Sequence, residues 1–102
     1  MPDLTVAIPH QLTRAEAKRR IEEGVTQLQQ QYGATLGHLT RTWNGDTMDF
    51  TLHVLGTTLP GQVHVEDQVV RVNVALPWMF SLLAERIKPQ IEQEGRKLLG
   101  RS

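Results

Sequence analysis

Four histidines are the residues of this chain most suited to chemistry, because a neutral imidazole is a common zinc ligand. His53 and His64 occupy polar positions of two neighbouring predicted strands, and a symmetric connection over 56–61 would place them opposite each other. His38 then falls diagonally from His53, and cross-strand Cβ atoms are about 5 Å apart, close enough to share an ion. No carboxylate or thiolate is placed to complete a tetrahedron. We therefore expect solvated histidines and no metal on this face, with His10 in a loop.

Paired carboxylates at 22–23 and 66–67 suggest acid–base catalysis, but their setting argues against it. Adjacent residues of a helix point apart and residues of a turn are solvated, so neither pair is expected to have the shifted pKa that catalysis needs. Ser81 and Ser102 are the only serines, neither lies in a nucleophile elbow, and the chain has no cysteine. These residues predict a non-enzymatic protein without a cofactor.

The densest apolar cluster of the chain comprises Trp78, Met79, Phe80 and Leu82. In one interpretation these side chains seal an end of the core. In the other, some stay exposed and bind an apolar surface, a protein partner or a second copy of the chain. Trp43, beside a predicted turn, has the same two interpretations. These five residues are the predicted partner-binding residues.

Length and charge limit the remaining classes of function. A chain of 102 residues predicts a single domain over 1–102, and its 11 basic and 11 acidic side chains give no net attraction to nucleic acid. The first residues lack an apolar leader, and the apolar run over 75–80 is far too short to span a bilayer. We expect a cytoplasmic protein that does not insert into membranes.

The first half of the chain reads as a strand, a helix and a hairpin. Alternation over 4–8 predicts a strand. Thr13 is a suitable N-cap for a helix that ends at Gly33, with Gly24 in its middle. Strands over 38–43 and 47–55 follow, joined by a two-residue turn of Asn44 and Gly45. Arg41 then lies among the apolar residues, near the edge of the sheet, with its charged head reaching solvent.

The second half reads as another hairpin and a long helix. A connection over 56–61 leads to Val63 and Val65, which pair across a turn at 67–68 with the alternating apolar residues of 70–76. Pro77 occupies the position of a helix N1 proline. The helix that follows contains Pro89, where a kink is expected, and Gly95, which favours a frayed end.

The element order is therefore strand, helix, four strands, helix. It predicts a two-layer α+β domain with an antiparallel five-stranded sheet in the order 1-5-4-3-2 and both helices on one face. This arrangement is similar to a reduced helix-grip fold. Such folds suggest an alternative function as a carrier of a hydroxyacyl or fatty acyl ligand, although the large core-facing residues of this chain predict a filled core. The open edge at the second strand leaves a homodimer as a further prediction.

Seven stretches distributed along the chain carry a family resemblance. They are HQLT at 10–13, EA at 16–17, QYG at 31–33, WNGD at 43–46, MDF at 48–50, GQVHV at 61–65 and VVRVNVALP at 69–77. Together they resemble the polyhydroxyalkanoic acid system family, small bacterial proteins associated with polyhydroxyalkanoate (PHA) storage. The resemblance implies a link to PHA granules or granule proteins. It brings no catalytic residues with it.

Overall fold

The structure is a computed structural model of the chain and describes residues 3–36, 38–54 and 56–100. Its elements are strand β1 (Asp3–Pro9), helix α1 (Arg14–Leu36), strands β2 (His38–Asn44), β3 (Thr47–Val54), β4 (Thr57–Val65) and β5 (Val69–Ala75), the 3₁₀ turn η1 (Trp78–Phe80) and helix α2 (Ser81–Leu99). The order of helices and strands is the predicted one.

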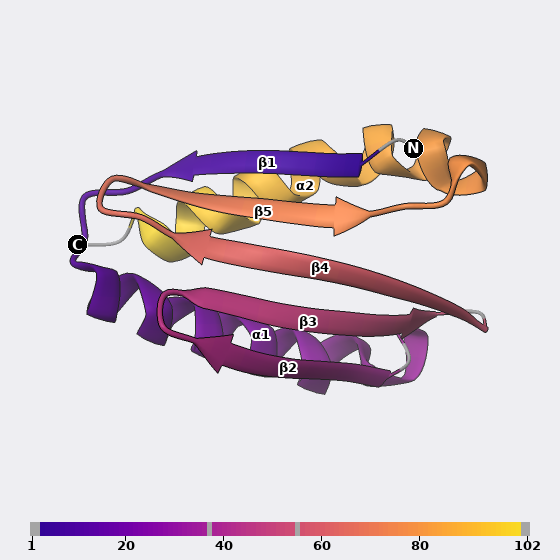
Figure 1. The fold of residues 1–102 in the computed structure, drawn as a ribbon, viewed down its shortest axis with the longest axis horizontal. Coiled ribbons are helices and arrows are strands. Elements are labelled where there is room, and N and C mark those ends of the chain that lie inside the picture. Colours follow the sequence, from indigo (N-terminus) through magenta and orange to yellow (C-terminus); the bar gives the residue numbers. More distant parts are fainter. Residues whose placement is uncertain (1–2, 37, 55, 101–102) are drawn as a thin grey trace.

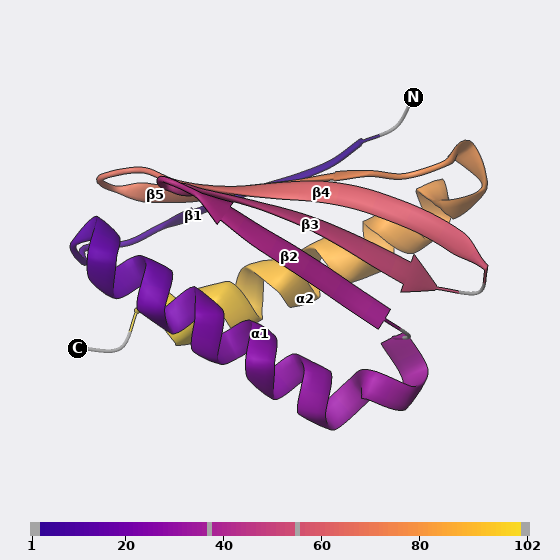
Figure 2. The same cartoon turned by 60° about the horizontal axis from the view of Figure 1, so that its bottom comes forward.

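The five strands form one antiparallel sheet in the order β1-β5-β4-β3-β2. Both helices lie on the same face of this sheet, α1 behind β2 and β3 and α2 behind β1 and β5 (Figure 1). Figure 2 shows the two layers from a second angle, with the helices below the strands. The predicted two-layer α+β fold is confirmed, whereas its likeness to a helix-grip arrangement stays a prediction.

The core lies between the apolar face of the sheet and the two helices. The register aligns Val6 with Val72 and Val72 with Val63, so alternate residues of neighbouring strands share this face. Val6 and Val63 are buried, and Val72 and Phe50 pack against them. The predicted inward face of the meander is therefore confirmed.

The turn between β2 and β3 differs from its prediction by one residue. Its central residues are Gly45 and Asp46, so that Asn44 lies opposite Thr47 and Trp43 opposite Met48. Gly45 adopts the positive φ of 63° that the turn requires. The prediction that Asn44 and Gly45 form the turn is wrong.

Contacts with α1 give the physical reason for this shift. The Nζ of Lys18 donates to the carbonyl oxygen of Gly45 at 2.6 Å, and the Nη1 of Arg14 donates to Asp46 at 2.7 Å. Both contacts join the first turns of α1 to the two turn residues in the observed register. Local turn preference is thus overridden by bonds between segments distant in sequence.

The predicted connection over 56–61 is also wrong, because β4 already begins at Thr57. Gly56 has a φ of 76° in the tight connection that precedes it. Pro60 is tolerated inside the strand because pairing between β4 and β5 starts only at Gly61. Its missing N–H therefore faces a stretch where β4 has no second neighbour.

The two helices end differently from the sequence expectations. Thr13 caps α1 as predicted, with its Oγ1 accepting the N–H of Glu16 at 3.1 Å. However, α1 continues beyond Gly33 as far as Leu36. Pro77 does not occupy the N1 position of α2, because η1 intervenes and the N–H of Phe80 donates to the Pro77 carbonyl at 2.9 Å.

Two glycines of the helices mark close approaches. A Cβ at Gly95 would lie 2.2 Å from Cδ1 of Ile8, so this glycine lets α2 pack directly on β1. A Cβ at Gly24 would lie 2.7 Å from Cδ2 of Leu98, where α1 meets α2. Gly95 is therefore a packing position, and α2 remains helical to Leu99, which is 2% exposed.

Candidate functional site

The turn η1 and the first residues of α2 each present a large apolar side chain to solvent. Buried Leu76 follows β5, and partly buried Phe80 packs against the core. Between and beyond these anchors, Met79 is 65% exposed and Leu82 is 76% exposed. They are the only exposed large hydrophobic residues among those whose burial the structure describes. The side chain of Trp78, also predicted to bind a partner, lies outside the described residues.

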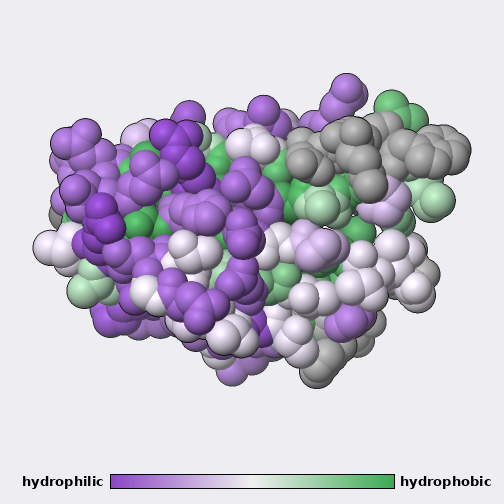
Figure 3. All heavy atoms as spheres, in the orientation of Figure 1, coloured by the Kyte–Doolittle hydropathy of each residue, from purple (hydrophilic) through white to green (hydrophobic). Residues whose placement is uncertain are grey.

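The surface around this site is less polar than the opposite end of the molecule. Figure 3 views the outer face of the sheet, where hydrophilic side chains gather at the end that holds the β2–β3 and β4–β5 turns. Hydrophobic atoms show at the other end, beside the start of α2. We call the exposed pair Met79 and Leu82 the α2-start patch. An exposed pair of this kind is suited to contact with another apolar surface.

Trp43 does not join this patch. It lies on β2, at the opposite edge of the sheet from β1, and its indole Nε1–H donates to Oε1 of Glu22 at 2.6 Å. The ammonium of Lys18 lies 5.1 Å from the centre of the indole ring, in cation–π range. Trp43 therefore helps to hold α1 on the sheet.

Glu22 is the centre of the polar contact between α1 and β2. Its two carboxylate oxygens accept bonds from Nε and Nη2 of Arg41 at 2.9 and 3.1 Å. The hydrogen bonds from Arg41, with that from Trp43, hold the pKa of Glu22 below its ordinary value. Arg41 also donates to Gln29 at 2.8 Å, so its predicted solvent-directed head is instead bound by α1.

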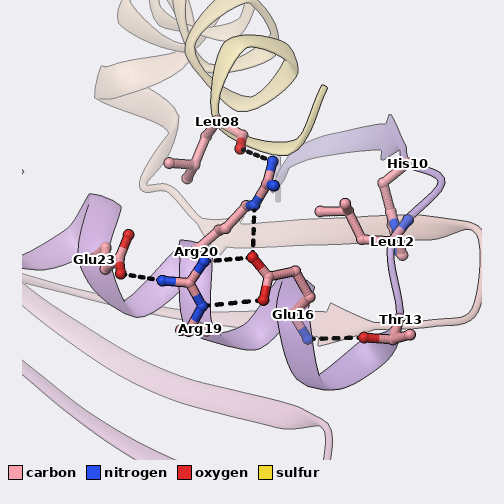
Figure 4. Close-up of polar contacts among 8 residues, drawn as sticks. All are labelled: His10, Leu12, Thr13, Glu16, Arg19, Arg20, Glu23 and Leu98. Carbon is pink, nitrogen blue, oxygen red and sulfur yellow. Dashed lines mark hydrogen bonds and ion pairs between the residues drawn. The ribbon is translucent and has the colours of Figure 1, made fainter. Parts of the chain in front are cut away.

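A second ion-paired cluster joins α1 to the end of α2 (Figure 4). Glu16 accepts bonds from Arg19 and, at 3.1 Å, from Nε of Arg20. Arg20 reaches onward to the carbonyl oxygen of Leu98 at 3.2 Å. These guanidinium groups, Arg19 first, lower the pKa of Glu16 to about 2. Glu16 and Glu22 are thus held ionised, which is the opposite of what a general acid requires.

His10 lies in a loop as predicted, but it is only 6% exposed, which the sequence did not reveal. Its Nδ1 accepts the N–H of Leu12 at 3.1 Å, and its Nε2 lies 2.9 Å from the carbonyl oxygen of Glu66. The ring thereby fixes the β1–α1 connection against the β4–β5 turn. Both nitrogens are engaged, and no local pattern distinguishes such a histidine from an exposed one.

The prediction that His53 and His64 lie opposite each other is wrong. His64 is aligned with Thr47 and His53 with Thr58. The two histidines are therefore six positions apart along the sheet, about 20 Å at the usual rise per residue. His38 lies directly opposite His53 and not diagonally from it as predicted, and its side chain lies outside the described residues. No group of three potential metal ligands occurs in the part of the chain that is described.

Two hollows among the described residues, of about 330 and 350 Å³, both open to solvent. One lies on α1 beside Glu22, and the other lies over the strands around Gly61. Neither is an enclosed acyl-chain site. Over Gly61 the core is filled by the Phe50 ring, whose Cζ would lie 2.3 Å from an added Cβ. The acyl carrier remains a prediction that no contact in the structure favours.

Comparisons with known proteins identify one family. The family model described as "Putative polyhydroxyalkanoic acid system protein" matches residues 4–99. No curated protein and no solved structure matches the chain. Among the described residues, no helix is both long enough and apolar enough to cross a membrane.

Proposed function

Because the chain belongs to the polyhydroxyalkanoic acid system family, we propose that it is a non-enzymatic accessory protein that binds the apolar surface of PHA granules in the cytoplasm. The surface that makes the contact is the α2-start patch. The family match extends over 4–99 and includes this patch. The match supplies the link to PHA, and the exposed side chains supply the mode of binding.

The exposure of Met79 and Leu82 carries this proposal. At 65% and 76% exposed, both have most of their apolar surface still in water. Burying a side chain of this kind gains about 1.5–3 kcal/mol, so covering both exposed portions gains roughly 3 kcal/mol. A gain of that size changes a dissociation constant by about two orders of magnitude. It suits reversible attachment to a surface that offers many equivalent positions.

The carboxylates and the buried histidine support a non-enzymatic role. Glu16 and Glu22 have lowered pKa values because arginine side chains bind them. Both nitrogens of His10 are engaged within the protein. Each of these three groups is occupied by contacts that stabilise the fold.

Co-sedimentation with granules stripped of their proteins tests the proposal. Wild-type protein and the double variant Met79→Ser/Leu82→Ser are mixed with washed granules, and the bound fraction is measured across a range of granule concentrations. We expect the double variant to bind about a hundredfold more weakly, because the two serines remove most of the apolar surface from the contact. Equal binding of the two proteins would contradict the proposal.

A matched variant in α2 separates surface chemistry from helix stability. Gln90→Ser/Gln93→Ser changes two exposed residues of α2 with the same spacing and the same introduced side chain. We expect it to bind as the wild type does. Phe80 is unsuitable for this test because it packs against the core, where serine would disturb folding.

A further inference from the structure

The outward-facing groups of β1 follow from its register with β5. The N–H of His10 donates to the carbonyl oxygen of Gln68 at 3.0 Å, one position beyond the pairing of Pro9 with Val69. Hydrogen-bonded and non-hydrogen-bonded pairs alternate along an antiparallel ladder. Counting back from His10, the even-numbered residues of β1 bond to β5. The backbone groups of Thr5 and Ala7 therefore point away from the sheet.

This outer edge of β1 carries little to discourage pairing. Positions 4–9 contain no charged residue, and the side chains of Thr5 and Ala7 are small. Natural edge strands are usually protected by charges, bulges, prolines or a covering segment. In β1 the residues that act in this way are Asp3 and Pro9, at its two ends. Positions 4–8 of β1 are thus an unprotected edge within the part of the chain that the structure describes.

The other edge of the sheet, β2, is protected by α1. In β2, hydrogen-bonded pairs with β3 alternate with non-bonded pairs, starting from the bonded pair that closes the two-residue turn. The backbone groups that do not bond to β3 are therefore those of Leu39, Arg41 and Trp43. Gln29 of α1 already donates to the carbonyl oxygen of Leu39 at 3.2 Å. The neighbouring Arg41 is a large charged residue held by Glu22. The sequence expectation of an open edge at the second strand is therefore better met by β1.

We propose that a second copy of this chain pairs with the free edge of β1, strand β1 against strand β1, across a two-fold axis. The pairing is antiparallel and joins the two sheets into one. With the axis at Thr5 or Val6, the free N–H and C=O groups of each strand meet those of its partner. This proposal rests on the strand edge and is independent of granule binding.

Two features favour a second copy over a different partner. The edge is self-complementary, because an antiparallel strand offers its own copy the same spacing of donors and acceptors. The chain has 11 basic and 11 acidic residues, so two copies have no net repulsion to overcome. Pairing β1 with β2 of another copy would instead give an open filament, and Gln29 obstructs it.

Light scattering and amide exchange of the intact chain test the proposal. We expect wild-type protein to approach twice the mass of one chain as its concentration rises a hundredfold. Over the same range the amides of Thr5 and Ala7 should exchange several-fold more slowly, since they become bonded only in the dimer. The amides of Val6 and Ile8 bond to β5 and should stay protected throughout. A wild type that remains monomeric at every concentration would overturn the proposal.

Two variants locate the interface. Ala7→Pro removes an N–H that points away from β5, so the fold retains its ladder while the dimer loses bonds. Thr5→Lys places a charge at the same edge, and Thr42→Lys makes the same change at an exposed threonine of β2. We expect the first two variants to be monomers with wild-type circular dichroism and the third to dimerise normally. A dimer that survives both changes in β1, or is lost through Thr42→Lys, would disprove the assignment.

Discussion

Helices α1 and α2 cover the same face of one sheet, yet different forces hold them there. α1 is joined to the strands by charged and polar side chains along one side. α2 lies against β1 through close apolar packing at Ile8 and Gly95. The comparison shows that one layer can combine two kinds of helix docking. That of α1 depends on pH, through its ionised side chains, and that of α2 depends on the volume of the side chains packed against it.

The contacts of α1 follow the helix from its first turn. Arg14 bonds to Asp46 and, at 2.6 Å, to Asp67, so it reaches both hairpin turns. Further along, Glu22 binds β2 through Arg41, as described above. The apolar contribution is a narrow stripe in which Ala17 is fully buried and Ile21 is 8% exposed. Much of the specificity of α1 docking is therefore electrostatic.

Gly95→Leu should have the largest effect, because it acts on the packed helix. The new side chain would enter the space of Ile8, which is 4% exposed and has no room to move away. Overpacking of this kind is expected to lower the free energy of unfolding by about 3 kcal/mol. Urea denaturation followed by circular dichroism measures the change.

The control for this variant is Gln93→Leu, which adds the same side chain to an exposed position of α2. We expect its unfolding free energy to stay within about 0.5 kcal/mol of the wild type. Equal losses in the two variants would mean that close packing at Gly95 does not hold α2.

Glu22→Gln should have a smaller effect, because it acts on the polar helix contact. The amide still accepts a bond from Trp43, but Arg41 loses its counter-charge while its side chain is only 22% exposed. Because the pair is partly solvated, we expect a loss of about 1 kcal/mol. Glu23→Gln, at a neighbouring exposed position, should cost less in the same urea titration. A larger loss from Glu23→Gln would show that the Glu22 contact contributes nothing special.

The smallest effect is a change in how stability depends on pH. Glu16, Glu22 and Asp46 all have pKa values lowered by arginine partners, and that of Glu16 is about 2. A carboxyl group whose pKa is lowered in the folded state stabilises the fold fully at any pH above its unfolded pKa of about 4. This stabilisation is lost as the pH falls through the pKa of the folded state. Between about pH 5 and 2 the unfolding free energy of Glu22→Gln should therefore fall less steeply than that of the wild type. Parallel curves from urea titrations at several pH values would contradict this.

The alternation of apolar and polar residues along the strands predicted the fold well, because each side chain of a strand can point only to one of two faces of the sheet, inward or outward. Register was harder to predict. Moving the β2–β3 turn by one residue shifts the pairing by two positions, so Trp43 faces the core in either register and the pattern cannot choose. The contact of Lys18 with Gly45 makes that choice, and such a bond leaves no trace in local sequence.

The candidate site was predictable only in part. The sequence places Met79 and Phe80 in one apolar cluster, but adjacent residues of a 3₁₀ turn point in different directions, and only the fold shows which is exposed. Trp43 was grouped with them because it lies beside a predicted turn. Its partner Glu22 is 21 residues away, and its role depends on the docking of α1.

Arg14 links the tips of two hairpins through a single side chain. One guanidinium bonds to Asp46 at the first tip and Asp67 at the second, both at the end where α1 begins. Displacing either tip alone would stretch its bond to this guanidinium group. The thermal motions of the two tips therefore become correlated. Relaxation measurements on the amides of 45–46 and 67–68 should detect this common motion. In Arg14→Gln the two turns should move independently of each other.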